Sequence, residues 1–204
     1  MRILLATEGE SDEVVGKRLV RSIFPHSEIQ PKRMPARGIA VVMRLLKDIV
    51  RAAHFGHFDL LVIHFDLDDT FVDAHQHVTE SKRWLEIRKE IDDLLLNQLK
   101  NKGDRTAPLQ AVLMAPAQST DAWLRWALMD GDGKKWEKKD RHALKREVFG
   151  NPPRKLIQTA TVLADRLIVQ MTECQHWPRS LRDFQGALET FKRGAETAQG
   201  NISK

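Results

Sequence analysis

Apolar and polar positions along the chain follow two periods, which predict strands that alternate with helices. Nearly unbroken apolar runs of strand length occupy residues 2–6, 60–65 and 109–114, and a less apolar extended segment occupies 28–33. Runs that are apolar on both faces are typical of strands in a parallel sheet covered by helices on both sides. Between them, apolar residues recur at helical spacing. This spacing predicts helices over about 13–23, 39–53, 81–101 and 120–128.

The alternation of strand and helix predicts an α/β fold with a mainly parallel sheet of about four strands and right-handed crossovers. Residues 1–130 hold this pattern, and 131–204 read as a helical C-terminal extension packed on it. Within the extension, 129–139 is rich in glycine and charge and is expected to be an exposed loop. A helix over about 141–148 should follow, then a long helix that begins at Pro152-Pro153. The last helix is expected to start at Ser180, with a frayed tail from Thr197.

Carboxylates follow two of the apolar runs, at the point where each predicted strand ends. Asp66 and Asp68 come directly after the run 60–65, and Glu8 follows the first strand. Asp121 opens the helix after the fourth strand. Because ligands of parallel α/β sheets bind at the carboxyl ends of the strands, these groups predict a cation site there, for Mg²⁺, Mn²⁺ or Ca²⁺ rather than zinc. An acidic turn that merely ends a strand is the alternative reading.

Composition restricts the classes of protein that fit the chain. Its 204 residues are 42% hydrophobic and 30% charged, which is ordinary for a soluble globular protein. No apolar stretch approaches the roughly 20 residues of a membrane span, and Glu8 interrupts the N-terminus too early for a secretory signal. We therefore expect a cytoplasmic location. The single cysteine, Cys174, has no partner for an internal disulfide and is expected to be inert.

The charge balance points to an anionic partner. The net charge is +5, and because acids gather at the strand ends, the remaining surface is more basic than this total suggests. Basic residues cluster in Lys134, Lys135, Lys138, Lys139, Arg141, Lys145 and Arg146, and again in Arg154 and Lys155. Such a cluster would attract a nucleic-acid backbone, although a solvated helix face has the same composition.

The segment Phe65-Asp66-Leu67-Asp68-Asp69-Thr70-Phe71-Val72-Asp73 resembles the first motif of the haloacid dehalogenase-like phosphatases. The resemblance implies that Asp66 is a nucleophile and Asp68 a general acid and base. In that family, however, the motif follows the first strand of the catalytic domain, whereas about 60 residues precede it here. The family's later acidic pair at the end of a strand is also missing.

The chain from residue 2 to about 130 also resembles the TOPRIM fold of topoisomerases, primases and OLD-type nucleases. Thr7-Glu8-Gly9-Glu10-Ser11-Asp12 resembles the glutamate motif of that fold, and Asp66-Leu67-Asp68 resembles its aspartate motif. Small stand-alone TOPRIM-like proteins carry an acidic residue and a tryptophan at the start of the helix after the next strand, which matches Asp121 and Trp123. The segment 177–180 resembles the entry to their last helix. This resemblance uses the first 60 residues, which the phosphatase motif leaves unexplained.

The TOPRIM-like resemblance implies a Rossmann-like fold and a phosphodiester hydrolase that uses Mg²⁺ or Mn²⁺ on nucleic acid, DNA rather than RNA. It implies Glu8, Asp66 and Asp68 as catalytic and metal-binding residues, with Asp121 as a further ligand and Asp12 in an outer role. The expected nucleic-acid contacts are Lys134, Lys135, Lys138, Lys139, Lys145 and Arg146. The chain contains no tyrosine, which excludes the covalent chemistry of a topoisomerase.

Two alternatives remain at this point. One is the phosphatase with Asp66 as nucleophile. The other is a non-catalytic TOPRIM subunit of a larger complex. The resemblance to OLD-type systems suggests an ATPase partner and a role in phage defence for either a catalytic or a non-catalytic TOPRIM protein.

Overall fold

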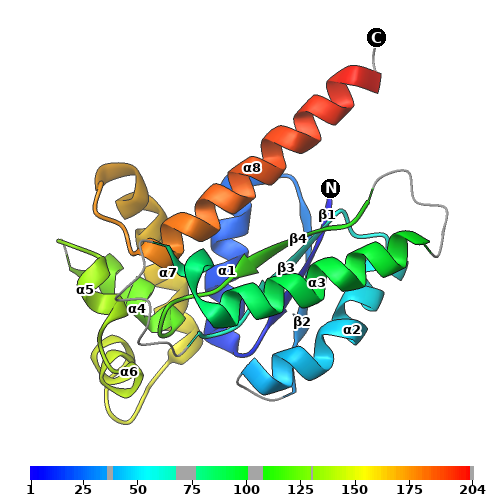
Figure 1. Ribbon diagram of the computed structural model, residues 1–204. Coiled ribbons are helices and arrows are strands. Elements are labelled where there is room, and N and C mark those ends of the chain that lie inside the picture. The colour runs from blue at the N-terminus through cyan, green and yellow to red at the C-terminus, as the bar shows by residue number, and fades with distance from the viewer. Residues whose placement is uncertain (36–38, 68–76, 101–107, 130, 203–204) are drawn as a thin grey trace.

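The computed structural model describes the chain except for residues 36–38, 68–76, 101–107, 130 and 203–204. Four strands form one parallel sheet in the order β2-β1-β3-β4 (Figure 1). They are β1 (Arg2–Thr7), β2 (Glu28–Arg33), β3 (Leu60–His64) and β4 (Gln110–Met114). The prediction of an α/β fold with a parallel sheet is confirmed, and the arrangement is consistent with a Rossmann-like fold.

Helices cover both faces of the sheet. Those of the first half are α1 (Glu10–Ile23), α2 (Ile39–Phe55), α3 (Lys82–Lys100), preceded by the short 3₁₀ helix η2 (Val78–Glu80), and α4 (Thr120–Leu128). Those of the second half are α5 (Lys134–Glu137), α6 (Arg141–Phe149), α7 (Leu156–Glu173) and α8 (Arg179–Ile202). No helix in the described part of the chain is long and apolar enough to cross a membrane.

The alternation of side chains along β1, β3 and β4 builds two separate cores. In β1, Ile3 and Leu5 face a core formed with α1, α4, α7 and α8, whereas Leu4 and Ala6 face a core formed with α2 and α3. Successive residues of a strand point to opposite faces of the sheet. A strand buried on both faces must therefore be apolar at every position, which is the pattern that the sequence shows.

Three local predictions are wrong. The segment predicted as an exposed loop over 129–139 contains α5, which buries Trp136 and Glu137. Pro152 and Pro153 lie in a turn before α7, which begins only at Leu156. The tail expected to fray from Thr197 continues α8 to Ile202.

Glu137 ties α5 to the start of α8 and to the core. Its carboxylate accepts backbone N–H groups of Arg179 and Ser180, at 2.8 Å each, and the Ser180 hydroxyl. Ser180 Oγ in turn accepts the indole N–H of Trp123 at 2.8 Å. Burial raises the pKa of Glu137, against the lowering effect of these hydrogen bonds. The carboxylate thus occupies the N-terminal end of α8, where N–H groups lack helical partners.

We expect Glu137→Ala to lower the free energy of unfolding by about 3 kcal/mol, because it leaves buried backbone donors without a partner. Urea denaturation followed by circular dichroism measures this loss. Glu147→Ala is the matched control, because Glu147 forms surface ion pairs with Arg125 and Lys139. The control should lose less than about 1 kcal/mol. Equal losses in the two variants would contradict the anchoring role of Glu137.

Candidate functional site

Parallel pairing of β1 with β3 brings two distant acidic motifs to one edge of the sheet. Ala6 of β1 lies opposite Ile63 of β3, so both strands end at the same level. Glu8 follows β1, and Asp66 follows β3 two residues beyond its last position. Both carboxylates are buried, with 6% and 7% of their surface exposed. They face one cavity of about 220 Å³.

The cavity combines acids on one side with cations from the C-terminal region on the other. The acids come from the strand ends and from the first turns of α1 and α4, and the cations come from α6. Its lining residues are Glu8, Ser11, Asp12, Asp66, Ser119, Asp121, Arg141, His142 and Lys145. Of the metal ligands expected from the sequence, Glu8, Asp66 and Asp121 therefore share one site. Asp68 lies outside the described residues.

Asp12 reaches the cavity because it does not cap α1. Ser11 or Asp12 is a natural cap by residue type, but Gly9 occupies the N-cap position and both residues lie in the first turn. The Asp12 carboxylate instead accepts the hydroxyl hydrogen of Thr120, with Oγ1 to Oδ1 at 2.7 Å. Asp12, whose place in the sequence is typical of a helix N-cap, is thus part of the acidic site.

Asp66 has cationic neighbours on both sides. Its Oδ2 lies 3.2 Å from Nη2 of Arg141, the first residue of α6. Its Oδ1 lies 3.4 Å from Nε2 of His64 and has no hydrogen-bond partner among the described residues. A buried carboxylate oxygen without a donor is costly unless another positive group contacts it.

His64 is fully buried beneath the carboxylates. Nε2 of its ring lies 3.0 Å from Oγ1 of Thr120 and 3.8 Å from Oδ1 of Asp12. Burial alone lowers the pKa of His64, but the negative charges of Asp12, Asp66 and Glu8 outweigh it and raise that pKa to about 9. Together with Arg141, the imidazolium compensates part of the negative charge of the site.

In Asp121, burial and the neighbouring negative charges act on the pKa in the same direction. Burial, followed by repulsion from Asp12 and Asp66, raises the pKa of Asp121 to about 7, although Lys145 and Arg141 act against this rise. Carboxylates that repel one another in a shared pocket are stabilised by a cation between them. The electrostatics of this pocket thus favour an added positive charge.

Carboxylate oxygens are the donors that Mg²⁺ and Mn²⁺ prefer. Four of them line this cavity, and the partnerless Oδ1 of Asp66 is a suitable donor atom. Among the described residues, no group of three or more His, Cys, Asp or Glu side chains is arranged to hold a metal ion. Arg141 contacts the other oxygen of Asp66, Oδ2, so a cation that needs both oxygens would have to displace this side chain. The donor chemistry fits a divalent cation, and Asp68, the remaining ligand expected from the sequence, lies outside the described residues.

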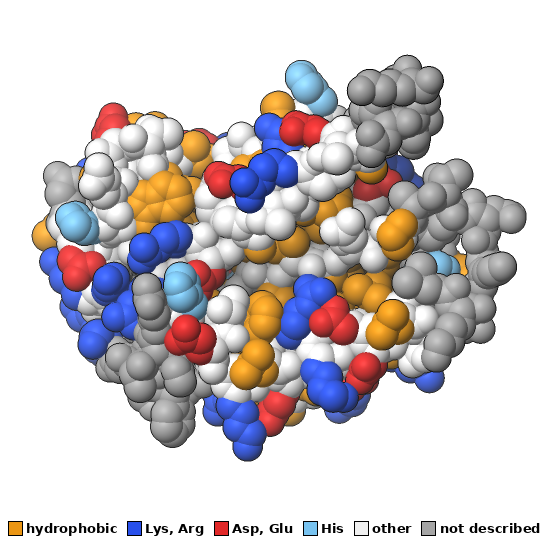
Figure 2. All heavy atoms as spheres, turned by 45° about the horizontal axis from the view of Figure 1, so that its top comes forward, with side chains coloured by type: hydrophobic (Ala, Val, Ile, Leu, Met, Phe, Trp, Pro, Cys, Tyr) orange, Lys and Arg blue, Asp and Glu red, His pale blue; other side chains and the backbone are white. Residues whose placement is uncertain are grey.

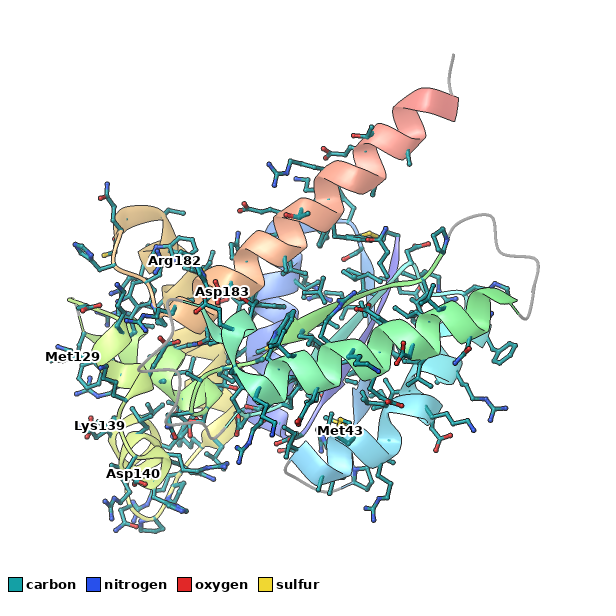
Figure 3. The ribbon with its side chains drawn as sticks, in the orientation of Figure 1. Met43, Met129, Lys139, Asp140, Arg182 and Asp183 are labelled. Carbon is teal, nitrogen blue, oxygen red and sulfur yellow. The ribbon has the colours of Figure 1, made fainter. Side chains whose placement is uncertain are left out.

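The cations of α6 carry the basic surface to the rim of the cavity. Arg141 and Lys145 are one helical turn apart and line the same cavity as His142. Asp140 caps α6 by accepting the backbone N–H of Ala143 at 2.9 Å, which fixes the start of this helix. Figure 3 labels Lys139 and Asp140 at the end of the molecule where α5 and α6 lie.

The residues predicted to contact nucleic acid differ in their surroundings. Lys145 lines the cavity, whereas Lys138 and Arg146 are exposed outside it. Lys135 and Lys139 lie over the ring of Trp136. The Nζ atom of Lys135 is 4.5 Å from the ring centre, and that of Lys139 is 5.3 Å from it. Lys134, partly buried, begins α5. Figure 2 shows a group of Lys and Arg side chains at one end of this face, and others spread over the rest of it. All six residues belong to the segment 134–146, of which Arg141, His142 and Lys145 line the cavity.

Sequence reasoning missed His64 and His142 as parts of the site, and it considered Thr120 only as a possible hydroxyl motif of the phosphatases. His64 had a usable signal, because it is the one ionisable residue in the apolar run 60–65. Thr120 reads as an ordinary residue at the start of a helix, and His142 as part of a basic run. Their roles depend on which elements meet at the sheet edge.

Comparisons of the chain with protein-family models, curated proteins and solved structures gave no match.

We expect Asp121→Asn to stabilise the cation-free protein more at pH 8 than at pH 5. Folding raises the pKa of Asp121 from its ordinary 3.8 to about 7. The folded state therefore holds the proton more tightly, so stability falls as pH rises from about 4 to about 7 and is constant above. Asparagine does not ionise, so the variant does not lose this stability as the pH rises. Thermal unfolding of the variant and the wild type in EDTA, at pH 5 and pH 8, measures the difference in stability.

Asp48→Asn is the control, since Asp48 is exposed on α2, away from the cavity. Its effect should be small and similar at the two pH values. A gain for Asp121→Asn that does not grow with pH would show that folding does not raise the pKa of Asp121.

Proposed function

We propose that this chain is a TOPRIM-like phosphodiester hydrolase that acts on nucleic acid, DNA rather than RNA, with Mg²⁺ or Mn²⁺. One observation carries the proposal. Glu8 and Asp66, from the two motifs that resemble the glutamate and aspartate motifs of the fold, line one cavity with Asp12 and Asp121. In the phosphatase reading, Glu8 and the first strand have no assigned part in the chemistry.

Hydrolysis of a phosphodiester needs a water that attacks phosphorus, an acceptor for its proton, and a donor for the leaving oxygen. A divalent cation held by Asp66, Asp68 and Asp121 would stabilise negative charge on the phosphate and activate the water. Glu8 either completes the ligand set or transfers a proton to or from the attacking or leaving oxygen. Its position at the end of β1, buried beside Asp66 in the cavity, is compatible with both roles.

The cations of α6 suit the substrate's phosphate. Arg141 and Lys145 line the acidic cavity from the opposite side to the strand ends. A guanidinium that now contacts Asp66 could exchange this carboxylate for a phosphate oxygen once a cation neutralises Asp66, because both are oxyanions. The lysines of α5 and α6 would hold the flanking backbone, which carries a negative charge at each phosphate.

Glu8→Gln and Asp66→Asn should each lower the rate of Mg²⁺-dependent DNA cleavage by about 100-fold or more, because each removes a negative charge needed for cation binding or proton transfer. Cleavage of supercoiled plasmid, followed on gels, measures the rate. Asp48→Asn, an exposed change on α2, should leave it unchanged.

The same assay separates the alternatives. A Glu8→Gln variant that keeps activity, with phosphate released from small phosphoesters and lost in Asp66→Asn, would support the phosphatase with an Asp66 nucleophile. Wild-type protein that binds Mg²⁺ and DNA but cleaves neither substrate would support a non-catalytic subunit. In that case, addition of a separately encoded ATPase would be the next test.

The double variant Lys138→Ala and Arg146→Ala should weaken DNA binding. It should also reduce the slope of log affinity against log salt concentration by about two, since about one phosphate contact is lost per residue. Fluorescence anisotropy with a short duplex in Ca²⁺ or EDTA, at several salt concentrations, measures both effects. The matched control is Lys47→Ala with Arg51→Ala, which removes two exposed charges from α2. Equal slopes in the two double variants would place DNA elsewhere on the surface.

A further inference from the structure

We infer that His64 and Thr120 are positioning residues, which hold the carboxylates of Asp12 and Asp66 in place for a divalent cation. The inference rests on the proposed function and adds to it the residues that organise the acidic site from beneath. Three contacts carry it. Nε2 of His64 lies 3.0 Å from Oγ1 of Thr120, which lies 2.7 Å from Oδ1 of Asp12. The same Nε2 lies 3.4 Å from Oδ1 of Asp66.

The direction of the hydrogen bonds follows from the number of hydrogens available. The carboxylate of Asp12 can only accept, so the single hydroxyl hydrogen of Thr120 points at it. Oγ1 of Thr120 must therefore accept from His64, and Nε2 of His64 must carry a hydrogen. The hydrogen bonds thus run from His64 to Thr120 to Asp12, while Nε2 of His64 makes a 3.4 Å electrostatic contact with Oδ1 of Asp66 without a hydrogen bond.

These residues come from three elements that are distant in sequence. His64 is the last residue of β3, Thr120 is the first of α4, and Asp12 lies in the first turn of α1. His64 and Thr120 are 0% and 1% exposed, so neither can contact a nucleic-acid substrate directly. Asp12 and Asp66, in contrast, line the cavity. The buried pair can act on the site only through these carboxylates.

The contacts explain how acids from different elements keep their orientation while they repel one another. Without the hydroxyl of Thr120, Oδ1 of Asp12 loses its donor and the buried Nε2 hydrogen of His64 loses its acceptor. The Asp12 carboxylate would then be free to turn towards solvent, away from Asp66 and Asp121. Residues that orient metal ligands through hydrogen bonds typically contribute 10-fold to 100-fold in metal affinity.

The test compares Thr120→Val with Thr120→Ser in the intact chain. Valine keeps the branched shape and removes the hydroxyl, whereas serine keeps the hydroxyl and removes a methyl group. Isothermal titration of Mn²⁺ into metal-free protein, without nucleic acid, gives the dissociation constant. Thr120→Val should raise it by about 10-fold or more, and Thr120→Ser should stay within about threefold of wild type.

A second readout separates positioning from a purely structural role. In plasmid cleavage, Thr120→Val should regain most of its rate at saturating Mn²⁺, because the defect lies in cation binding. A fold defect would instead lower the melting temperature and would not respond to Mn²⁺. If Thr120→Val does not fold, Asp12→Asn replaces it. The asparagine keeps the shape of the side chain and an oxygen acceptor, but it loses the negative charge that His64 and Thr120 hold in position. It should raise the dissociation constant by the same 10-fold or more.

The outcomes distinguish this inference from the proposed function. Wild-type protein that binds Mn²⁺, with a folded Thr120→Val that binds it equally well, would overturn the positioning role and leave the proposed function intact. Wild-type protein that binds no Mn²⁺ would overturn the proposed function, and the positioning role with it.

Discussion

The parallel pairing of β1 with β3 is the constraint on which the site depends. These two strands are neighbours in the sheet although a strand and two helices separate them in the chain. Because parallel strands end at the same edge, Glu8 and Asp66 meet there, and the helices that follow β1 and β4 begin nearby with Asp12 and Asp121. Four carboxylates thus come together through backbone topology rather than through any attraction among them.

Bringing these acids together costs free energy, which the surrounding structure offsets in part. Burial and repulsion raise the pKa of Asp121 to about 7, and the same negative charges raise that of His64 to about 9. Arg141 contacts Asp66 from the opposite side. The positive groups beneath and beside the acids stabilise the cluster, and a bound cation would stabilise it further. Unfavourable electrostatic interactions and shifted pKa values of this kind are typical of functional sites.

The C-terminal helices belong to the site as well as to the core. α6 supplies Arg141, His142 and Lys145 to the cavity, while α7 and α8 pack with α1 in one continuous core. Glu137 joins α5 to the start of α8 and, through Ser180, to Trp123 of α4. The helical region therefore holds Arg141, His142 and Lys145 against the acidic edge of the sheet.

The order of strands and helices, and the edge of the sheet at which Glu8, Asp66 and Asp121 lie, could be read from the sequence. Apolar periodicity reports burial, and parallel strands carry their ligands at one end. The sequence could not indicate α5, or the hydrogen bonds that run from His64 through Thr120 to Asp12. Each of these depends on side chains from elements far apart in the chain. Local propensity describes a residue's neighbours in sequence, whereas a buried polar group is held by its neighbours in space, and only the packed structure determines which residues these are.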